Sequence, residues 1–167
     1  MNRFFLQFIF IFFLIQEVYS DESVNEIGSY FNWSAYFWNL KDGKVCAIVS
    51  SPLKEEGKYT RRGKVYSQVS LNAGNNSGVV SFQAGYTFKN KSEVNINIDN
   101  KNNMILQSVG RVAWTVSNEE DRKLIKFMQL GNEMVVKGVS SRGTNTKDTY
   151  SLKGFSAAFK AISEECK

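Results

Sequence analysis

The closing stretch of the chain, residues 134–166, constrains the fold most, because it ends on one of only two cysteines. It contains apolar residues at the i, i+3, i+4 and i+7 spacing of an amphipathic helix: Phe155, Ala158, Phe159 and Ile162. This spacing predicts a helix over about 155–165, and Cys166 follows on the same face. The other cysteine, Cys46, lies near the opposite end of the chain. We therefore predict that a Cys46–Cys166 disulfide ties the last helix to one of the first strands.

The start of the chain has the composition of a secretory signal peptide. An apolar segment over 4–15 is too short to cross a bilayer, and Val18 and Ser20 are small enough to precede a cleavage site. We predict a cleaved signal peptide over 1–20 and a single domain over 21–167, with an uncleaved membrane anchor as the alternative. Export to an oxidising compartment also favours a disulfide over free or metal-bound thiols.

The charge and the absence of histidine narrow the classes of function. The net charge is +5, and the lysines and arginines are spread along the chain. This distribution predicts a basic surface with weak attraction to anionic lipid or polysaccharide, and no nucleic-acid groove. Without histidine, the Ser–His–Asp and Cys–His mechanisms and histidine zinc sites are excluded. We expect no catalytic residues, no metal and no cofactor.

Short runs of alternating apolar and polar residues predict strands over 31–37, 45–50, 65–71, 79–88 and 94–98, and more weakly over 104–109 and 111–115. The turns between them, rich in Asn and Gly, predict a mainly β, single-domain fold: an antiparallel β-sandwich or a barrel-like sheet. Ser117 and Glu120 form a capping box, which predicts a second α-helix over 118–130. The charged segment 54–62 is predicted to be a solvated loop.

Several segments resemble the invasion-associated locus B family, an exported family found mainly in alphaproteobacteria. The segments are FNWSAY, GKVCAIVSSP, RRGKVYSQVS, VVSFQAGYTFKNKSEVNINID and KLIKFMQLGNEMVVKGVSSRGTNTKDTYSLKGFSAAFKAI. The resemblance implies an exported β-rich protein that is periplasmic, associated with the outer membrane or secreted, has no catalytic residues, and is linked to host-cell invasion in pathogens. It places the family's paired cysteines on Cys46 and Cys166. It places the family's closing loop on Arg142, Gly143, Thr144, Asp148 and Tyr150.

The closing loop, RGTNTKDTYSL, is the candidate interaction site. We predict that Arg142 and Asp148 pair across the loop between two strands, while Thr144 and Thr146 satisfy turn amides. In the alternative, Arg142 and Tyr150 form part of a ligand-facing surface.

The favoured function is an exported, non-enzymatic domain that acts through contacts with an unidentified envelope or host protein or surface component. Peripheral membrane association is compatible with this function, and the sequence leaves the oligomeric state open. Contacts of this kind predict exposed aromatic residues or a sheet edge, around Tyr36, Trp38 and Tyr66.

Two alternatives remain from the sequence. The first is a carrier of a small apolar ligand, with a cavity lined by residues such as Phe82, Ile96 and Trp114, although tight core packing is the default for such positions. The second is a glycan hydrolase, which needs two carboxylates across a cleft. The acids considered for that role are Asp99, Glu119, Glu120 and Asp148.

Overall fold

The computed structural model describes residues 23–73 and 75–167, so the predicted signal peptide over 1–20 lies outside the described residues. In chain order the elements are β1 (Asn25–Tyr30), β2 (Trp33–Leu40), β3 (Gly43–Ser50), β4 (Lys54–Gly57), β5 (Tyr66–Asn72), β6 (Asn75–Gln83), β7 (Val94–Ile98), β8 (Asn102–Val109), β9 (Val112–Trp114), α1 (Asn118–Leu130), β10 (Glu133–Val139), β11 (Asn145–Ser151) and α2 (Phe155–Glu165). Among these helices, none is long and apolar enough to cross a membrane.

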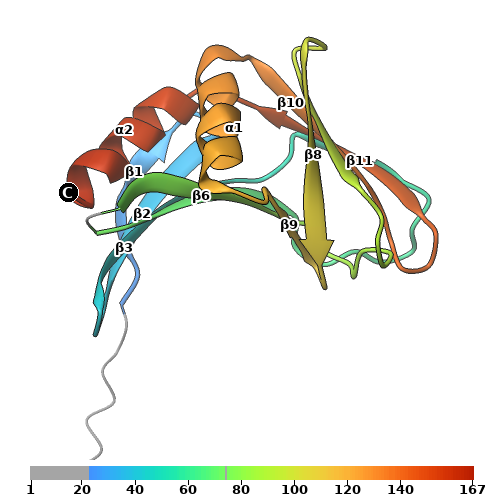
Figure 1. The fold of residues 1–167 in the computed structure, drawn as a ribbon, viewed down its shortest axis with the longest axis horizontal. Coiled ribbons are helices and arrows are strands. Elements are labelled where there is room, and N and C mark those ends of the chain that lie inside the picture. Colours follow the sequence, from blue (N-terminus) through green and yellow to red (C-terminus); the bar gives the residue numbers. More distant parts are fainter. Residues whose placement is uncertain (1–22, 74) are drawn as a thin grey trace, which may run out of the picture.

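The strands form one bent antiparallel sheet in the order β1-β2-β3-β5-β6-β9-β8-β7-β10-β11-β4 (Figure 1). The edges are β1 and β4, which do not pair with each other, so the sheet is open and the barrel-like alternative is not formed. Its bend brings the inner faces of the two halves together, as in a sandwich. Phe82 of β6 and Tyr150 of β11, both almost fully buried, have ring centroids 6.3 Å apart. The prediction of a mainly β antiparallel fold is confirmed.

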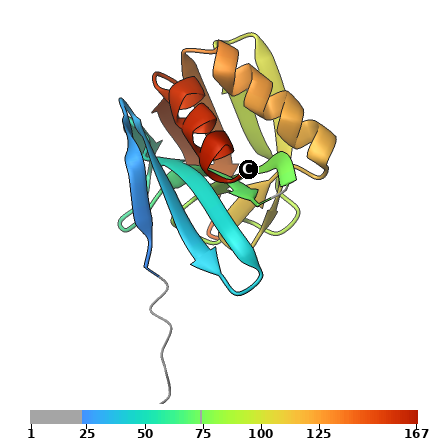
Figure 2. The same ribbon diagram turned by 90° about the vertical axis from the view of Figure 1, so that its left-hand side faces the viewer.

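Both helices cover the same side of the sheet (Figures 1 and 2). Helix α1 packs on β6 and α2 packs on β1, β2 and β3. Each begins and ends close to the predicted residues, because its determinants are local. Ser117 caps α1 by accepting a hydrogen bond from the Glu120 amide at 3.3 Å. In α2, Phe155 packs edge-to-face on Trp33 at 4.9 Å between ring centroids, and this contact anchors the helix to β2.

The structure contains the predicted disulfide between Cys46 of β3 and Cys166, the residue that follows α2. The two Cα atoms are 6.1 Å apart, and both residues are buried. Beside them, Lys44 pairs with Glu165 at the surface. The disulfide therefore links the C-terminal end of α2 covalently to β3, in the first half of the sheet.

Two local predictions are wrong. The charged segment 54–62 is not entirely a loop, because β4 pairs with β11 at the sheet edge. The strand predicted over 79–88 ends at Gln83, since Gly85 has a φ of +74°, which a continuing strand cannot contain. Both corrections concern the part of the molecule that holds the candidate site.

Candidate functional site

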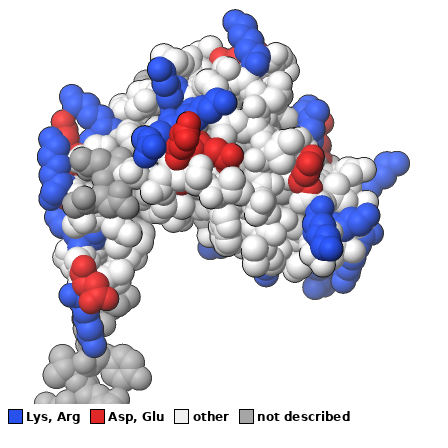
Figure 3. All heavy atoms as spheres, in the orientation of Figure 1, with Lys and Arg blue, Asp and Glu red and all other residues white. Residues whose placement is uncertain are grey.

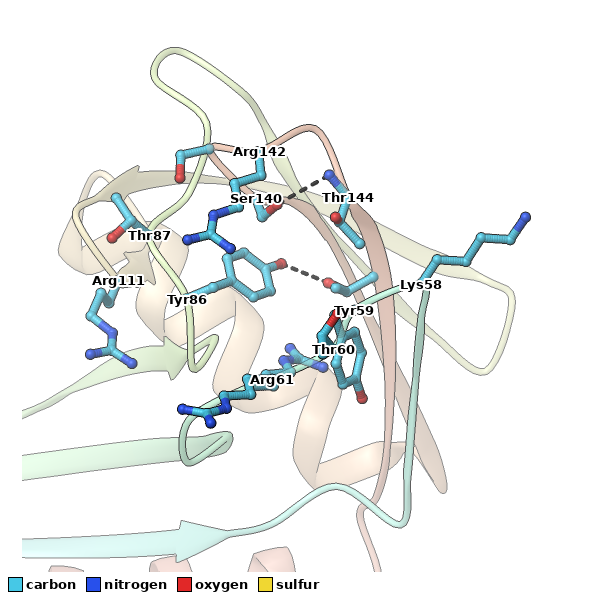
Figure 4. A pocket seen from close by; sticks show the side chains of 13 residues that line it. Lys58, Tyr59, Thr60, Arg61, Tyr86, Thr87, Arg111, Ser140, Arg142 and Thr144 are labelled. Atoms are coloured by element: carbon cyan, nitrogen blue, oxygen red, sulfur yellow. Dashed lines mark hydrogen bonds between the residues drawn. The ribbon is translucent and has the colours of Figure 1, made fainter.

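The candidate site is a hollow of about 700 Å³ beside the tip of the β10–β11 hairpin (Figure 4). Besides the tip, residues 140–144, it is bounded by the loop over 58–62, by Tyr86 and Thr87, and by Arg111. We call this hollow the basic pocket. Its lining has no acidic residue, and its charged members are Lys58, Arg61, Arg62, Arg111 and Arg142.

Arg62 forms the buried base of the basic pocket. Its Nη1 and Nη2 atoms donate to the two carboxylate oxygens of Asp148, both at 2.6 Å, and its Nε donates to the Ala84 carbonyl at 2.7 Å. The Arg62 side chain is 3% exposed and that of Asp148 is 6% exposed. A second carboxylate, that of Glu55, lies 3.6 Å from Nη1. This bidentate ion pair fixes the side chains of Arg62 and Asp148 in one arrangement.

Two tyrosine rings complete the surroundings of Arg62. Its guanidinium carbon lies 5.4 Å from the centroid of the Tyr59 ring and 5.1 Å from that of the Tyr86 ring. The Tyr86 hydroxyl hydrogen-bonds the Thr146 hydroxyl at 2.6 Å. Burial disfavours the charge of Arg62, but the hydrogen bonds and charge of Asp148 outweigh it and raise the pKa of Arg62. Burial also raises the pKa of the Tyr86 phenol.

A close approach of two glycines fixes the loop that carries Arg61 and Arg62. The Gly63 amide donates to the Gly85 carbonyl at 2.9 Å. A Cβ at Gly85 would lie 2.4 Å from the Gly63 carbonyl oxygen, and one at Gly63 would lie 2.7 Å from Nη2 of Arg111. That Nη2 atom donates to the same Gly85 carbonyl at 3.0 Å. A side chain at Gly85 would collide with the Gly63 backbone, whereas one at Gly63 would displace the end of the Arg111 side chain. The two glycines therefore let the loop, residues 84–86 and Arg111 lie this close together.

The hairpin tip has its own internal hydrogen bonds. The Ser140 amide donates to the Thr144 carbonyl at 2.9 Å, and the Ser140 hydroxyl accepts from the Thr144 amide at 3.1 Å. Gly143, with a φ of +83°, closes the turn. The Ser141 amide donates to the Thr87 carbonyl at 2.8 Å, which holds the tip against the segment after β6. The tip therefore presents Arg142 from a fixed backbone.

Three arginines face the hollow without a carboxylate partner. Arg142 reaches down from the tip toward Tyr86, while Arg111 lies to one side and Arg61 lies below (Figure 4). No ion pair involves any of the three within the described residues. Lys and Arg side chains also gather at the surface of the end of the molecule where the β10–β11 hairpin lies (Figure 3). The basic pocket thus concentrates positive charge that the protein itself does not balance.

Residues 33–163 match the family described as Invasion associated locus B (IalB) protein. The match begins at the first residue of β2, ends within α2 and includes the whole basic pocket. This chain belongs to the IalB family. Membership associates it with invasion-linked, exported bacterial proteins. No curated protein and no solved structure gives a significant match.

The predicted pairing of Arg142 with Asp148 is wrong in this IalB-family structure. Asp148 occupies an inward position of β11, opposite Val136 of β10, and its carboxylate is used by Arg62. Arg142 lies instead at the exposed hairpin tip. The alternative surface of Arg142 and Tyr150 is also wrong, because Tyr150 is 1% exposed and packs on Phe82. Burial raises the pKa of the Tyr150 phenol.

Of the predicted closing loop, Arg142 and Thr144 line the basic pocket, and Gly143 forms its turn. Sequence reasoning missed Arg61, Arg62 and Arg111. The two adjacent arginines of the RRGKVYSQVS segment end a charged run whose composition predicts a solvated loop. The remaining signal was the pair of glycines at Gly63, directly after Arg62, and Gly85, which permit the close backbone approach.

The four acids considered for hydrolysis have separate contacts in the IalB-family fold. Glu119 is exposed in the first turn of α1, and Glu120 accepts from the Val116 amide at 3.0 Å as part of the helix cap. Asp148 pairs with Arg62, and Asp99 accepts from backbone amides at the start of β10. No cluster of three or more His, Cys, Asp or Glu side chains suited to a metal occurs in residues 23–73 and 75–167.

Asp99 gives a pH-dependent prediction. Its carboxylate accepts from the amides of Glu133 at 2.9 Å and Asn132 at 3.0 Å, and these bonds lower its pKa. Because the folded pKa is depressed, the stabilisation is present above the unfolded value of about 3.9 and is lost as the pH falls through the folded pKa. We expect Asp99→Asn, which keeps the positive φ of this turn, to be less stable than the native protein at pH 7. The difference should shrink below about pH 4 in urea unfolding; a constant difference would contradict this account.

The residues considered for an apolar cavity do not face one space. Phe82 and Ile96 are buried in the core. Trp114 is 37% exposed on the outer face of the sheet, since its neighbour Ala113 points inward opposite Phe82. Tyr36, Trp38 and Tyr66 are half-buried on the same outer face, away from the helices. The aromatic residues expected at a contact surface are therefore only partly accessible.

Proposed function

We propose that this IalB-family chain is an exported, non-enzymatic binding domain, and that its basic pocket contacts acidic groups on an envelope or host surface component. The observation that carries the proposal is the presence of three arginines without carboxylate partners around one hollow, on a backbone fixed by the Arg62–Asp148 pair. Charges held in place before binding contribute more to affinity than charges on mobile side chains, because less ordering is needed when the complex forms.

The absence of histidine and the separate contacts of the four acids support a binding function over catalysis. A hydrolase would need two carboxylates about 5–9.5 Å apart across a cleft. The basic pocket has no carboxylate in its lining. Its hydroxyl and guanidinium groups are donors that suit recognition of anions.

The proposal predicts that removing two pocket charges abolishes most binding to an anionic surface. We expect Arg61→Gln/Arg142→Gln to weaken retention on sulfated dextran beads by about 30-fold, from about 1 kcal/mol for each basic side chain near such a surface. Both side chains are exposed, so the fold should persist. Plain dextran beads report retention that does not depend on charge.

The matched control removes the same number of charges elsewhere. Lys101 lies in the β7–β8 turn, at the opposite end of β10 from the hairpin tip, and Lys126 is exposed on α1. If the pocket is the contact site, Lys101→Gln/Lys126→Gln should bind like the native protein. If the two double variants lost retention equally, binding would depend only on the net charge of the protein, and the proposal would be contradicted.

A further inference from the structure

We infer that the basic pocket recognises a phosphomonoester, the dianionic phosphate group at the end of a sugar or a lipid headgroup. This inference rests on the proposed function and specifies the ligand of the same site. Four features carry it: the number of unbalanced charges, the shape of the donors, the presence of free hydroxyl donors, and the rigidity of the lining.

The number of charges favours a multiply charged ligand. Arg62 is neutralised by Asp148, whereas Arg61 and Arg111 line the hollow without an ion pair in the part of the chain that the structure describes. Arg142 adds a further unpaired charge. A phosphomonoester carries about −1.5 to −2 charges at pH 7, whereas a carboxylate or a sulfate ester carries one. A site with several cationic side chains therefore attracts a phosphomonoester more strongly than a ligand with a single charge.

The donors also fit a tetrahedral phosphate. A guanidinium presents a planar fork of N–H groups that binds two phosphate oxygens at once. The arginines line the hollow from three separate segments, so a phosphate bound there would be approached from more than one side (Figure 4). The Ser140 hydroxyl accepts from the Thr144 amide and therefore keeps its own proton available for the hollow that it lines.

The lining is rigid before the ligand arrives. The loop with Arg61 is held by the buried neighbour Arg62 and by the hydrogen bond between Gly63 and Gly85. Arg111 donates to the Gly85 carbonyl, and the amide of Ser141 ties the hairpin tip to Thr87. Because these segments are bonded to one another, binding costs little ordering of the backbone.

The ligand's own titration provides a distinctive test. A phosphomonoester loses its second proton near pH 6, whereas a sulfate ester does not titrate there. The titratable side chains that line the pocket or lie behind it are Lys58, Tyr59, Arg61, Arg62, Tyr86, Arg111, Arg142, Glu55 and Asp148. No histidine occurs in the chain, so no side chain with an ordinary pKa titrates between about pH 5.5 and 7.5. Any rise in affinity over that range belongs to the phosphate.

The experiment measures binding of glucose 6-phosphate, glucose 6-sulfate and glucuronate to the full-length gene product by titration calorimetry. We expect the phosphate to bind at least about tenfold more tightly than the other two at pH 7.5, and to bind more weakly at pH 5.5. Affinity for the sulfate should stay constant with pH. Vesicles with phosphatidic acid, compared with vesicles of phosphatidylglycerol, test whether a phosphomonoester is preferred to a phosphodiester on a lipid surface. The affinity for phosphatidic acid vesicles, compared with that for glucose 6-phosphate, distinguishes the lipid source from the soluble one.

Variants connect the measurement to the pocket. Arg61→Gln/Arg142→Gln should abolish the preference for phosphate, Lys101→Gln/Lys126→Gln should keep it, and Arg142→Lys should lose part of it because the fork is lost while the charge remains. Thermal melting confirms that each variant is folded. Equal, pH-independent binding of sulfate and phosphate would overturn the inference and leave the proposed function standing. Failure to bind any acidic ligand, including sulfated dextran, would overturn both.

Discussion

Replacing both Cys46 and Cys166 by alanine should lower the free energy of unfolding by about 4–5 kcal/mol, because the disulfide closes a very long loop in the unfolded chain. The cysteines are 120 residues apart in sequence, and the bond joins α2 to the first half of the sheet. Equilibrium unfolding in urea, followed by circular dichroism, measures the loss. For a domain with ordinary stability, the loss is a large part of the total.

Two controls separate the bond from its surroundings. Native protein that has been reduced in urea and refolded under reductant has the same side-chain volume without the bond, so it should resemble the double alanine variant. Lys44→Met removes the neighbouring ion pair with Glu165, whose two side chains are about one third exposed, and should cost no more than about 1 kcal/mol. If the double alanine variant unfolded at the same urea concentration as the native protein, packing alone would be sufficient to hold α2 in place.

The helices and the disulfide could be predicted from sequence because their determinants are local or few. Ser117 and Glu120 define the start of α1 within three residues, and the apolar stripe of α2 needs no partner to be recognised. With only two cysteines in a chain predicted to be exported, one pairing is available. Alternation likewise identified most of the buried strands, whose inward positions are apolar.

The basic pocket could not be predicted because it depends on pairing between distant strands. Asp148 and Arg62 are 86 residues apart, and neither belongs to an apolar pattern. Their meeting requires β4 to pair with β11 at the sheet edge. The sequence of β4, KEEG, has little strand propensity, and its pairing is supported by the Lys147–Glu56 ion pair at 3.1 Å across the two strands. Interactions of this kind leave no periodic pattern in the sequence from which the pairing could be predicted.

Removing either member of the Arg62–Asp148 pair should cost about 3–5 kcal/mol, since the remaining charge would stay buried without its partner. Both Asp148→Ala and Arg62→Ala are expected to show this loss in urea unfolding. Arg142→Ala, at the exposed hairpin tip, is the matched control and should change stability by no more than about 0.5 kcal/mol. If Asp148→Ala were as stable as Arg142→Ala, the pair would not hold the pocket together.

A double substitution then separates the charge from the packing. Arg62→Met/Asp148→Leu replaces the pair by apolar side chains of similar size, and such replacements are often neutral, so the double variant should be more stable than either single alanine variant. It also leaves the net charge of the pocket unchanged, because the two removed charges cancel. Phosphate binding measured by calorimetry should therefore survive in the double variant and be lost in Arg62→Ala, where the unpaired carboxylate of Asp148 leaves a negative charge behind the pocket. Loss of binding in the stable double variant would show that the pocket needs the hydrogen bonds of Arg62 and not only a balanced charge.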